Sequence, residues 1–272
     1  MEMRGRLELA NDNAAAFHLA QASARGWEHV RGPGFAAVRC HPEPVEAHRV
    51  VVTRPYPDPA ALEARLVALF KEWRTEHLCL EDPYGGLDLS RFGCAAGLGQ
   101  AVMVREPGAA GRAAAVPGRP TAAGLTVHQV ADADGLAEVE RTVVDGFPVL
   151  ARLPWQRGGL LPEVLLDLPG HRAWLARWHG APASACVTYD DGATVGAYWV
   201  ATLPQHRSKG AARAVLEHAL AAHPDRVATL TATLLGEPLY RRMGFREHGV
   251  SRWWRFPAAP PVLAAAEDPP RP

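Results

Sequence analysis

The stretch VATLPQHRSKGAA, residues 200–212, joins a predicted strand to a predicted helix. An apolar, strand-like run ends at Pro204, and a polar and basic turn leads directly into an Ala-rich helix that we expect over residues 210–223. Three small residues occupy the first turn of this helix: Gly210, Ala211 and Ala212. They leave its free N–H groups accessible, and Arg207 and Lys209 add positive charge beside them. The turn therefore predicts a binding site for a phosphate or pyrophosphate.

The sequence around this turn is typical of a mixed α/β domain. Its strand-like runs are residues 125–131, 183–190, 193–203, 226–233 and 245–256. Helical runs alternate with them at residues 133–147, 210–223 and 236–243. Asp190, Asp191 and Gly192 predict a tight hairpin between two of the strands. Residues 148–179 are rich in Leu and Trp, and we expect them to be irregular to helical.

A second motif, LYRRMGF at residues 239–245, predicts a short helix with a tyrosine, followed by a glycine turn that opens a strand. The run RSKGAA at residues 207–212 fits the R/Q-x-x-G-x-G/A pattern of the GNAT superfamily of N-acetyltransferases. LYRRMGF resembles the second signature of that superfamily, and the order of elements from 125 to 256 is similar as well. The resemblance implies a GNAT-like fold of the α/β (α+β) class, in which helices flank a mixed central sheet.

The resemblance also implies acetyl-CoA as a co-substrate and no metal. The backbone amides of the basic turn would hold the pyrophosphate of acetyl-CoA: Arg207, Ser208, Lys209, Gly210, Ala211 and Ala212. The backbone of Val200 and Thr202 would pair with the pantetheine amides as a further strand would. Tyr240 would lie near the sulfur.

The chemistry that the resemblance implies is attack of a neutral amine on the thioester carbonyl, which expels a thiolate. Because a thiol has a pKa near ~8.5 and tyrosine one near ~10, Tyr240 can supply the proton as the sulfur leaves. A backbone N–H of the strand at 198–202 would stabilise the oxyanion. The alternative is that Tyr240 only packs its ring against the core.

The sequence does not identify a general base. The strand at 196–203 holds no Glu, Asp or His. Four residues of the substrate-side segment are candidates: Asp145, Glu163, Asp167 and His171. A water relay, or an amine that arrives already neutral, would serve equally well. Four tryptophans could line an acceptor pocket or simply pack: Trp155, Trp174, Trp178 and Trp199.

The N-terminal half shows a similar order of elements. An amphipathic helix at 59–74 lies between strand-like runs, and LDLSRFGC at 87–94 precedes another such run at 99–106. Aligning Gly93 with Gly244 places Leu89 at the position of Tyr240. The turn before the helix at 59–74 is RPYPDP, whose prolines lack the N–H groups that a phosphate needs. We therefore interpret this half as a degenerate GNAT-like copy, the alternative being an unrelated α/β domain.

Composition divides the chain into four segments. Residues 107–124 are built from Pro, Gly and Ala and predict a linker, and the Pro-rich residues 257–272 predict a disordered tail. An accessory or degenerate GNAT-like domain at 1–106 and a GNAT domain at 125–256 remain. Of the 272 residues 48% are hydrophobic, which suits ordinary globular cores.

Charge and cysteine content restrict the function. Lys and Arg number 29, as do Asp and Glu, and this balance argues against nucleic-acid or acidic-membrane binding. No apolar run approaches the ~20 residues that span a bilayer, and the N-terminus does not read as a signal peptide. The four cysteines form no CxxC pair, so we expect buried thiols in a cytoplasmic protein. The scarcity of lysine indicates a GC-rich genome, and we expect a bacterial source.

The most specific function that follows is transfer of an acetyl group to a primary amine of a small molecule, peptide or protein. The alternatives are a protein that binds acyl-CoA without turnover, and an acyltransferase that uses a longer acyl-CoA or a hydroxyl acceptor. The identity of the acceptor and the oligomeric state stay open, with a homodimer among the options.

Overall fold

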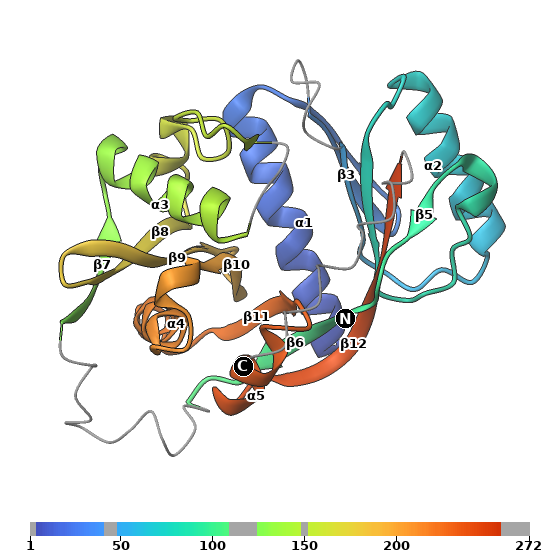
Figure 1. Ribbon diagram of the computed structural model, residues 1–272. Coiled ribbons are helices and arrows are strands. Elements are labelled where there is room, and N and C mark those ends of the chain that lie inside the picture. Colours follow the sequence, from blue (N-terminus) through green and yellow to red (C-terminus); the bar gives the residue numbers. More distant parts are fainter. Residues whose placement is uncertain (1–3, 41–47, 109–123, 148–151, 257–272) are drawn as a thin grey trace, which may run out of the picture.

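In the described part of the chain, twelve strands join in one sheet (Figure 1). The structure is a computed structural model, and it describes residues 4–40, 48–108, 124–147 and 152–256. The strands of the N-terminal half are β1 (Glu28–Gly32), β2 (Phe35–Arg39), β3 (His48–Val52), β4 (Leu78–Asp82), β5 (Ala95–Ala96) and β6 (Gln100–Arg105). Those of the C-terminal half are β7 (Leu125–Val130), β8 (His171–Trp178), β9 (Ala181–Asp190), β10 (Thr194–Thr202), β11 (Val227–Ala232) and β12 (Arg246–Phe256). The α-helices are α1 (Arg6–Arg25), α2 (Pro59–Glu72), α3 (Ala133–Gly146), α4 (Ala211–Ala221) and α5 (Glu237–Arg242).

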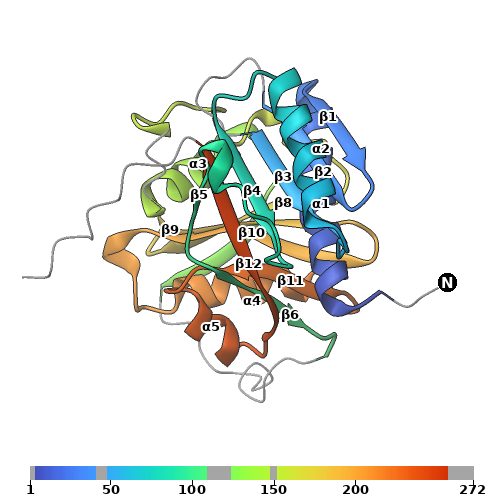
Figure 2. The same ribbon diagram turned by 90° about the vertical axis from the view of Figure 1, so that its right-hand side faces the viewer.

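Each half of the chain contributes a strand to the other half's part of the sheet. The strand order is β1-β2-β3-β4-β12-β6-β11-β10-β9-β8-β7, and β5 pairs with β12 off this path. Strand β6 thus lies between β11 and β12, although it comes from the N-terminal half. The end of β12 lies between β4 and β5, with Trp254 opposite both Leu80 and Ala96. Figure 2 shows β12 crossing the middle of the sheet.

The two halves repeat one topology. In the N-terminal half the parallel pair β3 and β4 is connected through α2, and in the C-terminal half the parallel pair β10 and β11 is connected through α4. The other strand pairs of the described chain are antiparallel. The fold is therefore a GNAT-like mixed sheet flanked by helices, with an N-terminal GNAT-like half.

The turn that follows the last parallel strand repeats in detail. The N–H of Cys94 donates to the carbonyl of Leu89 at 3.3 Å, and the N–H of Phe245 donates to that of Tyr240 at 3.0 Å. The glycines of the two turns are left-handed, with φ +79° and +89°. Leu89 therefore stands where the C-terminal half has its tyrosine.

The two halves differ at the helix that follows the first parallel strand. The carboxylate of Asp58 caps α2 and accepts the N–H of Ala61 at 3.0 Å. The N-cap of α4 is Gly210, which has no side chain. An acidic cap repels an anion, so of these two helix N-termini that of α4 suits a phosphate and that of α2 does not.

Helix α1 was not expected from the sequence. It packs against strands of both halves, among them β2, β3, β6 and β10 (Figure 1). Its buried residues include Asn13, whose amide nitrogen donates to the carbonyls of Tyr189 and Thr194 at 3.2 and 3.1 Å. Such buried polar residues interrupt the apolar periodicity from which an amphipathic helix is predicted.

The expectation that residues 148–179 are irregular to helical is wrong for β8. This strand pairs with β7 and β9, and its residues Ala173 to Ala176 are all buried. Burial on both faces removes the alternation of apolar and polar residues that marks an exposed strand. The predicted tail and nearly all of the predicted linker lie outside the described residues, and the domain boundaries stay a prediction.

Because of the strand exchange, residues 124–256 expressed alone should fail to form a stable domain. Without β6, strands β11 and β12 lose the partner that their backbone groups bond. Co-expression with residues 1–108 should restore a soluble complex. Circular dichroism and size-exclusion chromatography check this, and a lone C-terminal half that unfolds cooperatively would contradict it.

Candidate functional site

Strands β10 and β11 separate in the middle of the sheet. Their paired positions run from Thr194 opposite Val227 to Gly196 opposite Thr229, and no pairing continues beyond them. On the other edge of β10 a β-bulge follows Tyr198, where Trp199 adopts a left-handed φ of +53°. The bulge bends β10 away from β11 and opens a gap between the two strands.

The free edge of β10 faces this gap. The N–H of Leu203 donates to the carbonyl of Ala183 on the β9 side at 3.0 Å, and the carbonyl of Ala201 accepts the Ser184 hydroxyl at 2.6 Å. The N–H and C=O groups of one strand residue point to one edge of the strand, and those of the next residue point to the other edge. The backbone groups of Thr202 and Val200 are therefore directed toward the gap, where a cofactor chain could pair with them.

The end of β10 leads through the short helix η4 (Pro204–His206) to the open N-terminus of α4. Ser208 and Gly210 are left-handed, with φ of +61° and +84°, and these conformations turn the chain into the helix. A Cβ at Gly210 would meet nothing within 4 Å, so the space beside this N-cap residue is open. In the first turn of α4, Ala211 is buried, whereas Ala212 and Arg213 are partly exposed. The free N–H groups of such a turn suit an anion.

The two predicted basic residues have different surroundings. The guanidinium of Arg207 donates to the carbonyls of Gly146 and Thr202 at 3.1 and 3.4 Å, so it ties the turn to the end of α3 and to β10. The Lys209 ammonium lies 5.7 Å from the ring centre of Trp178 and is exposed. Lys209 can therefore reach a phosphate more readily than Arg207 can.

Tyr240 lies in an apolar cluster next to β10. Its side chain is 7% exposed, its ring centre is 6.0 Å from that of Phe245, and Val200 packs against the same cluster. Burial raises the pKa of the Tyr240 phenol, so it stays protonated at neutral pH. Within the described ranges no hydrogen bond to its hydroxyl is present. The phenol therefore keeps its proton available for a ligand.

The four candidate bases do not converge on the gap. Glu163 and Asp167 are exposed, and Asp145 is paired with Arg141 at 3.5 Å. His171 is buried, and burial together with the nearby Arg25 lowers the pKa of its imidazole to about 4. A small pocket lies next to the gap, and none of the four lines it.

The tryptophans are mainly packing residues. Trp174 is 2% exposed and donates to the Thr188 hydroxyl at 2.9 Å. Trp155 donates to Glu140 at 3.1 Å, and the ring centre of Trp199 is 6.4 Å from that of Phe147. Of the four, only Trp178 contacts a residue of the basic turn, through its cation–π pair with Lys209.

The side chain of Glu140 on α3 is fully buried, which the sequence did not predict. It accepts the N–H groups of three residues of the segment between α3 and β8: Gly158, Leu160 and Leu161. It thereby fixes that segment against α3. No signal in the sequence distinguishes this glutamate from Glu138, which is half-buried on the same helix.

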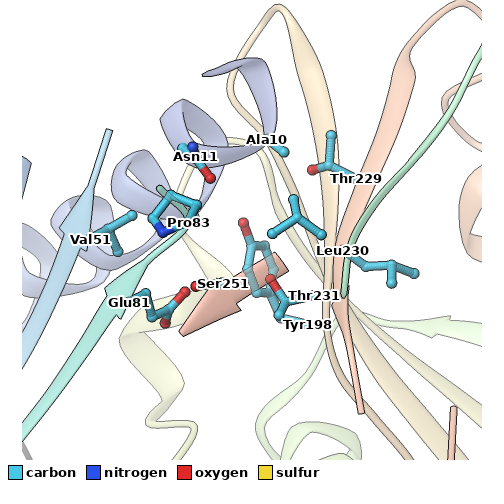
Figure 3. A pocket seen from close by; sticks show the side chains of 12 residues that line it. Ala10, Asn11, Val51, Glu81, Pro83, Tyr198, Thr229, Leu230, Thr231 and Ser251 are labelled. Carbon is cyan, nitrogen blue, oxygen red and sulfur yellow. The ribbon is translucent and has the colours of Figure 1, made fainter. Parts of the chain in front are cut away.

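A pocket adjoins the gap on the side of the sheet that α1 covers (Figure 3). It is lined by β10 and β11, but also by α1, β3, β4, β6 and β12. Both halves of the chain therefore contribute to it. In the described part of the chain no cluster of three His, Cys, Asp or Glu residues could hold a metal ion, and no helix there could cross a membrane.

Residues 169–247 match the sequence profile of the acetyltransferase (GNAT) domain family. This segment includes β10 and β11, which border the gap, the N-terminus of α4, and Tyr240. The chain carries a GNAT acetyltransferase domain. This GNAT domain implies acyl transfer with acetyl-CoA as the co-substrate. No curated protein matches the chain in sequence.

Solved structures resemble this chain over most of its length. A GCN5-related N-acetyltransferase from Kribbella flavida has a TM-score of 0.61 at 22% identity, and the similarity covers 89% of this chain and 95% of that one. A second such protein, from Sphaerobacter thermophilus, has a TM-score of 0.55 at 15% identity and coverages of 93% and 94%. A tandem GNAT protein from the clavulanic acid biosynthesis pathway has a TM-score of 0.52 at 14% identity and coverages of 93% and 96%. At these identities the similarities show a common fold.

Proposed function

We propose that the protein transfers the acetyl group of acetyl-CoA to a primary amine by direct attack within a ternary complex. One observation carries this proposal: the free edge of β10 leads directly to the uncovered N-terminus of α4. A strand edge suits the amides of pantetheine, and a helix N-terminus suits a pyrophosphate. The pantetheine and the pyrophosphate would thus bind to adjacent surfaces, in the order in which they follow one another in acetyl-CoA.

The proposed cofactor residues follow from this arrangement. Val200 and Thr202 offer backbone groups along the gap, and the first-turn amides of Ala211 and Ala212 would bind the pyrophosphate. Ser208, Lys209 and Gly210 shape the turn, and Lys209 adds charge. Arg207 acts chiefly by holding the turn in place, because its guanidinium already bonds two carbonyls.

Tyr240 is the proposed proton donor. As the amine nitrogen bonds to the carbonyl carbon and the carbon–sulfur bond breaks, the phenol protonates the leaving sulfur. A backbone N–H of β10 at the gap would stabilise the oxyanion. This chemistry needs neither a covalent acyl-enzyme nor a metal.

The setting that we propose is the cytoplasm. The four cysteines are all free and buried, which suits a reducing compartment. We further propose that the acceptor is an amine compound, and that neither nucleic acid nor a membrane is a partner. The equal numbers of acidic and basic residues support this, since both of those partners attract a basic surface.

The proposal is tested by measuring CoA release from acetyl-CoA in the presence of n-butylamine, spermidine and an N-blocked lysine. At least one of these amines should accelerate CoA release, and the product should be its amide. Binding of acetyl-CoA without acceleration by any amine would contradict acetyl transfer to amines and would favour a protein that binds acyl-CoA without turnover.

A further inference from the structure

The pocket at the gap begins where β10 and β11 part. Tyr198 and Thr231, which line it, are each two residues beyond the last paired positions, Gly196 and Thr229. Its volume is about 20 Å³, which is enough for one water-sized group such as an amino group. A group held here would lie beside the gap into which the thioester reaches under the proposed function.

The one acidic residue among those that line the pocket is Glu81, which comes from the N-terminal half (Figure 3). It lies on β4, is 8% exposed, and is opposite Trp253 of β12 in the exchanged part of the sheet. Its Oε1 atom is 3.5 Å from the guanidinium of Arg49 and 3.9 Å from the imidazole of His18. Its other oxygen, Oε2, accepts no hydrogen bond from the described residues, so the carboxylate keeps an acceptor for a ligand.

The charges around Glu81 set its proton affinity. Burial raises the pKa of the Glu81 carboxyl, against the lowering effect of Arg49 and Arg255. Burial and Arg49 lower the pKa of His18 to about 3, so this histidine stays neutral and does not act as a counter-ion. The two arginines also disfavour a positive charge in the pocket, which favours a neutral, nucleophilic amine there.

A second polar group also lacks a partner. Ser251 of β12 is 2% exposed, and its hydroxyl, which lines the pocket, bonds to none of the described residues. A buried hydroxyl without a partner is rare because it loses its hydrogen bonds to water. The Ser251 hydroxyl and the Glu81 carboxylate are both acceptors, as the N–H groups of an amine require.

We propose that Glu81, supplied by the N-terminal half, binds the acceptor's amino group and is the base for acetyl transfer in the C-terminal half. The proposal rests on the proposed function. The amine nitrogen bonds to the acetyl carbon, the carbon–sulfur bond breaks, and the nitrogen loses its proton to Glu81. The sulfur takes the proton of Tyr240, and both side chains then return to their starting states by exchange with water.

This assignment explains two features of the chain. Strand β10 needs no acidic residue of its own, because the Glu81 carboxylate of β4 lines the pocket beside the gap. The strand exchange also acquires a role, since it joins β4 to β12 and so brings Glu81 and Ser251 to one pocket. The N-terminal half then remains necessary although its own helix α2 cannot hold a phosphate.

The test compares wild type with Glu81→Gln in the CoA-release assay with n-butylamine, spermidine and N-blocked lysine. For the best amine, kcat/KM should fall by about 100-fold. The affinity for acetyl-CoA, measured by calorimetry, should stay within about twofold, because Glu81 lies on the acceptor side of the gap. Ser251→Ala should raise KM for the amine by a few fold and leave kcat nearly unchanged.

Glu63→Gln is the matched control. Glu63 is also buried in the N-terminal half, but it bonds Arg91 and the N–H of Asp88 and does not line the pocket. Its replacement should leave kcat/KM for the amine within about twofold.

Amine-dependent turnover that is equal in wild type and Glu81→Gln would overturn the role of Glu81 and leave acetyl transfer intact. Equal losses of acetyl-CoA affinity in Glu81→Gln and Glu63→Gln would also overturn the role of Glu81, because Glu81 would then be a structural residue. A wild type that binds acetyl-CoA but responds to no amine would overturn the proposed function itself.

Discussion

Replacing Ala212 with glutamate should lower the affinity for acetyl-CoA by about 100-fold or more. Ala212 is the second residue of α4, so the new carboxylate would lie beside the first-turn N–H groups. Two unit charges of the same sign at about 4 Å repel by about 4 kcal/mol at an effective dielectric constant near 20, and salt reduces this. The helix itself should be stabilised slightly, because an acidic residue in the first turn interacts well with its dipole.

Ala212→Gln is the control for this variant. It adds the same bulk without charge, so it should bind acetyl-CoA much more tightly than Ala212→Glu does. Ala212 is a better position than Gly210, whose φ of +84° would strain any other residue. Calorimetric titration of both variants distinguishes the cases: equal affinities would remove the pyrophosphate from this helix end.

Replacing Tyr240 with phenylalanine should lower turnover by about 1000-fold and leave acetyl-CoA affinity nearly unchanged. The ring keeps its packing against Phe245, and the lost hydroxyl has no partner among the described residues. The fold should therefore tolerate the change. Steady-state rates with the best amine, together with a calorimetric affinity, measure the two effects separately.

Tyr189→Phe provides the matched control for the tyrosine. Tyr189 lies on β9 and is partly buried, and its ring centre is 5.9 Å from that of Phe17 of α1. Its replacement should leave turnover within about twofold. If Tyr240→Phe turns over as fast as wild type, Tyr240 serves only to pack the core.

Local patterns predicted much of the C-terminal half. The Ala-rich run at 210–223 forms α4 at Ala211–Ala221, and the glycine turn after Tyr240 opens β12 as expected. These elements are short, close in sequence, and marked by glycine or by a clear periodicity. The place of Val200 at a free strand edge could also be anticipated, because the family resemblance implied it.

Long-range pairing was not predictable from such patterns. Nothing in the residues of β6 indicates that it lies between β11 and β12, since that choice depends on which edges are free in the folded sheet. The same holds for Glu81, which looks like an ordinary strand residue until β4 pairs with β12. Buried carboxylates such as Glu140 gain their partners only when distant backbone segments meet.

We propose that the C-terminal half of the chain holds acetyl-CoA and that the N-terminal half does not. Calorimetric titration of the wild type with acetyl-CoA measures both the affinity and the number of sites. We expect micromolar affinity, about −8 kcal/mol, with one site per chain. The single site follows from the open N-terminus of α4 and from the Asp58 carboxylate that caps α2. Absence of binding, or two sites per chain, would contradict this account.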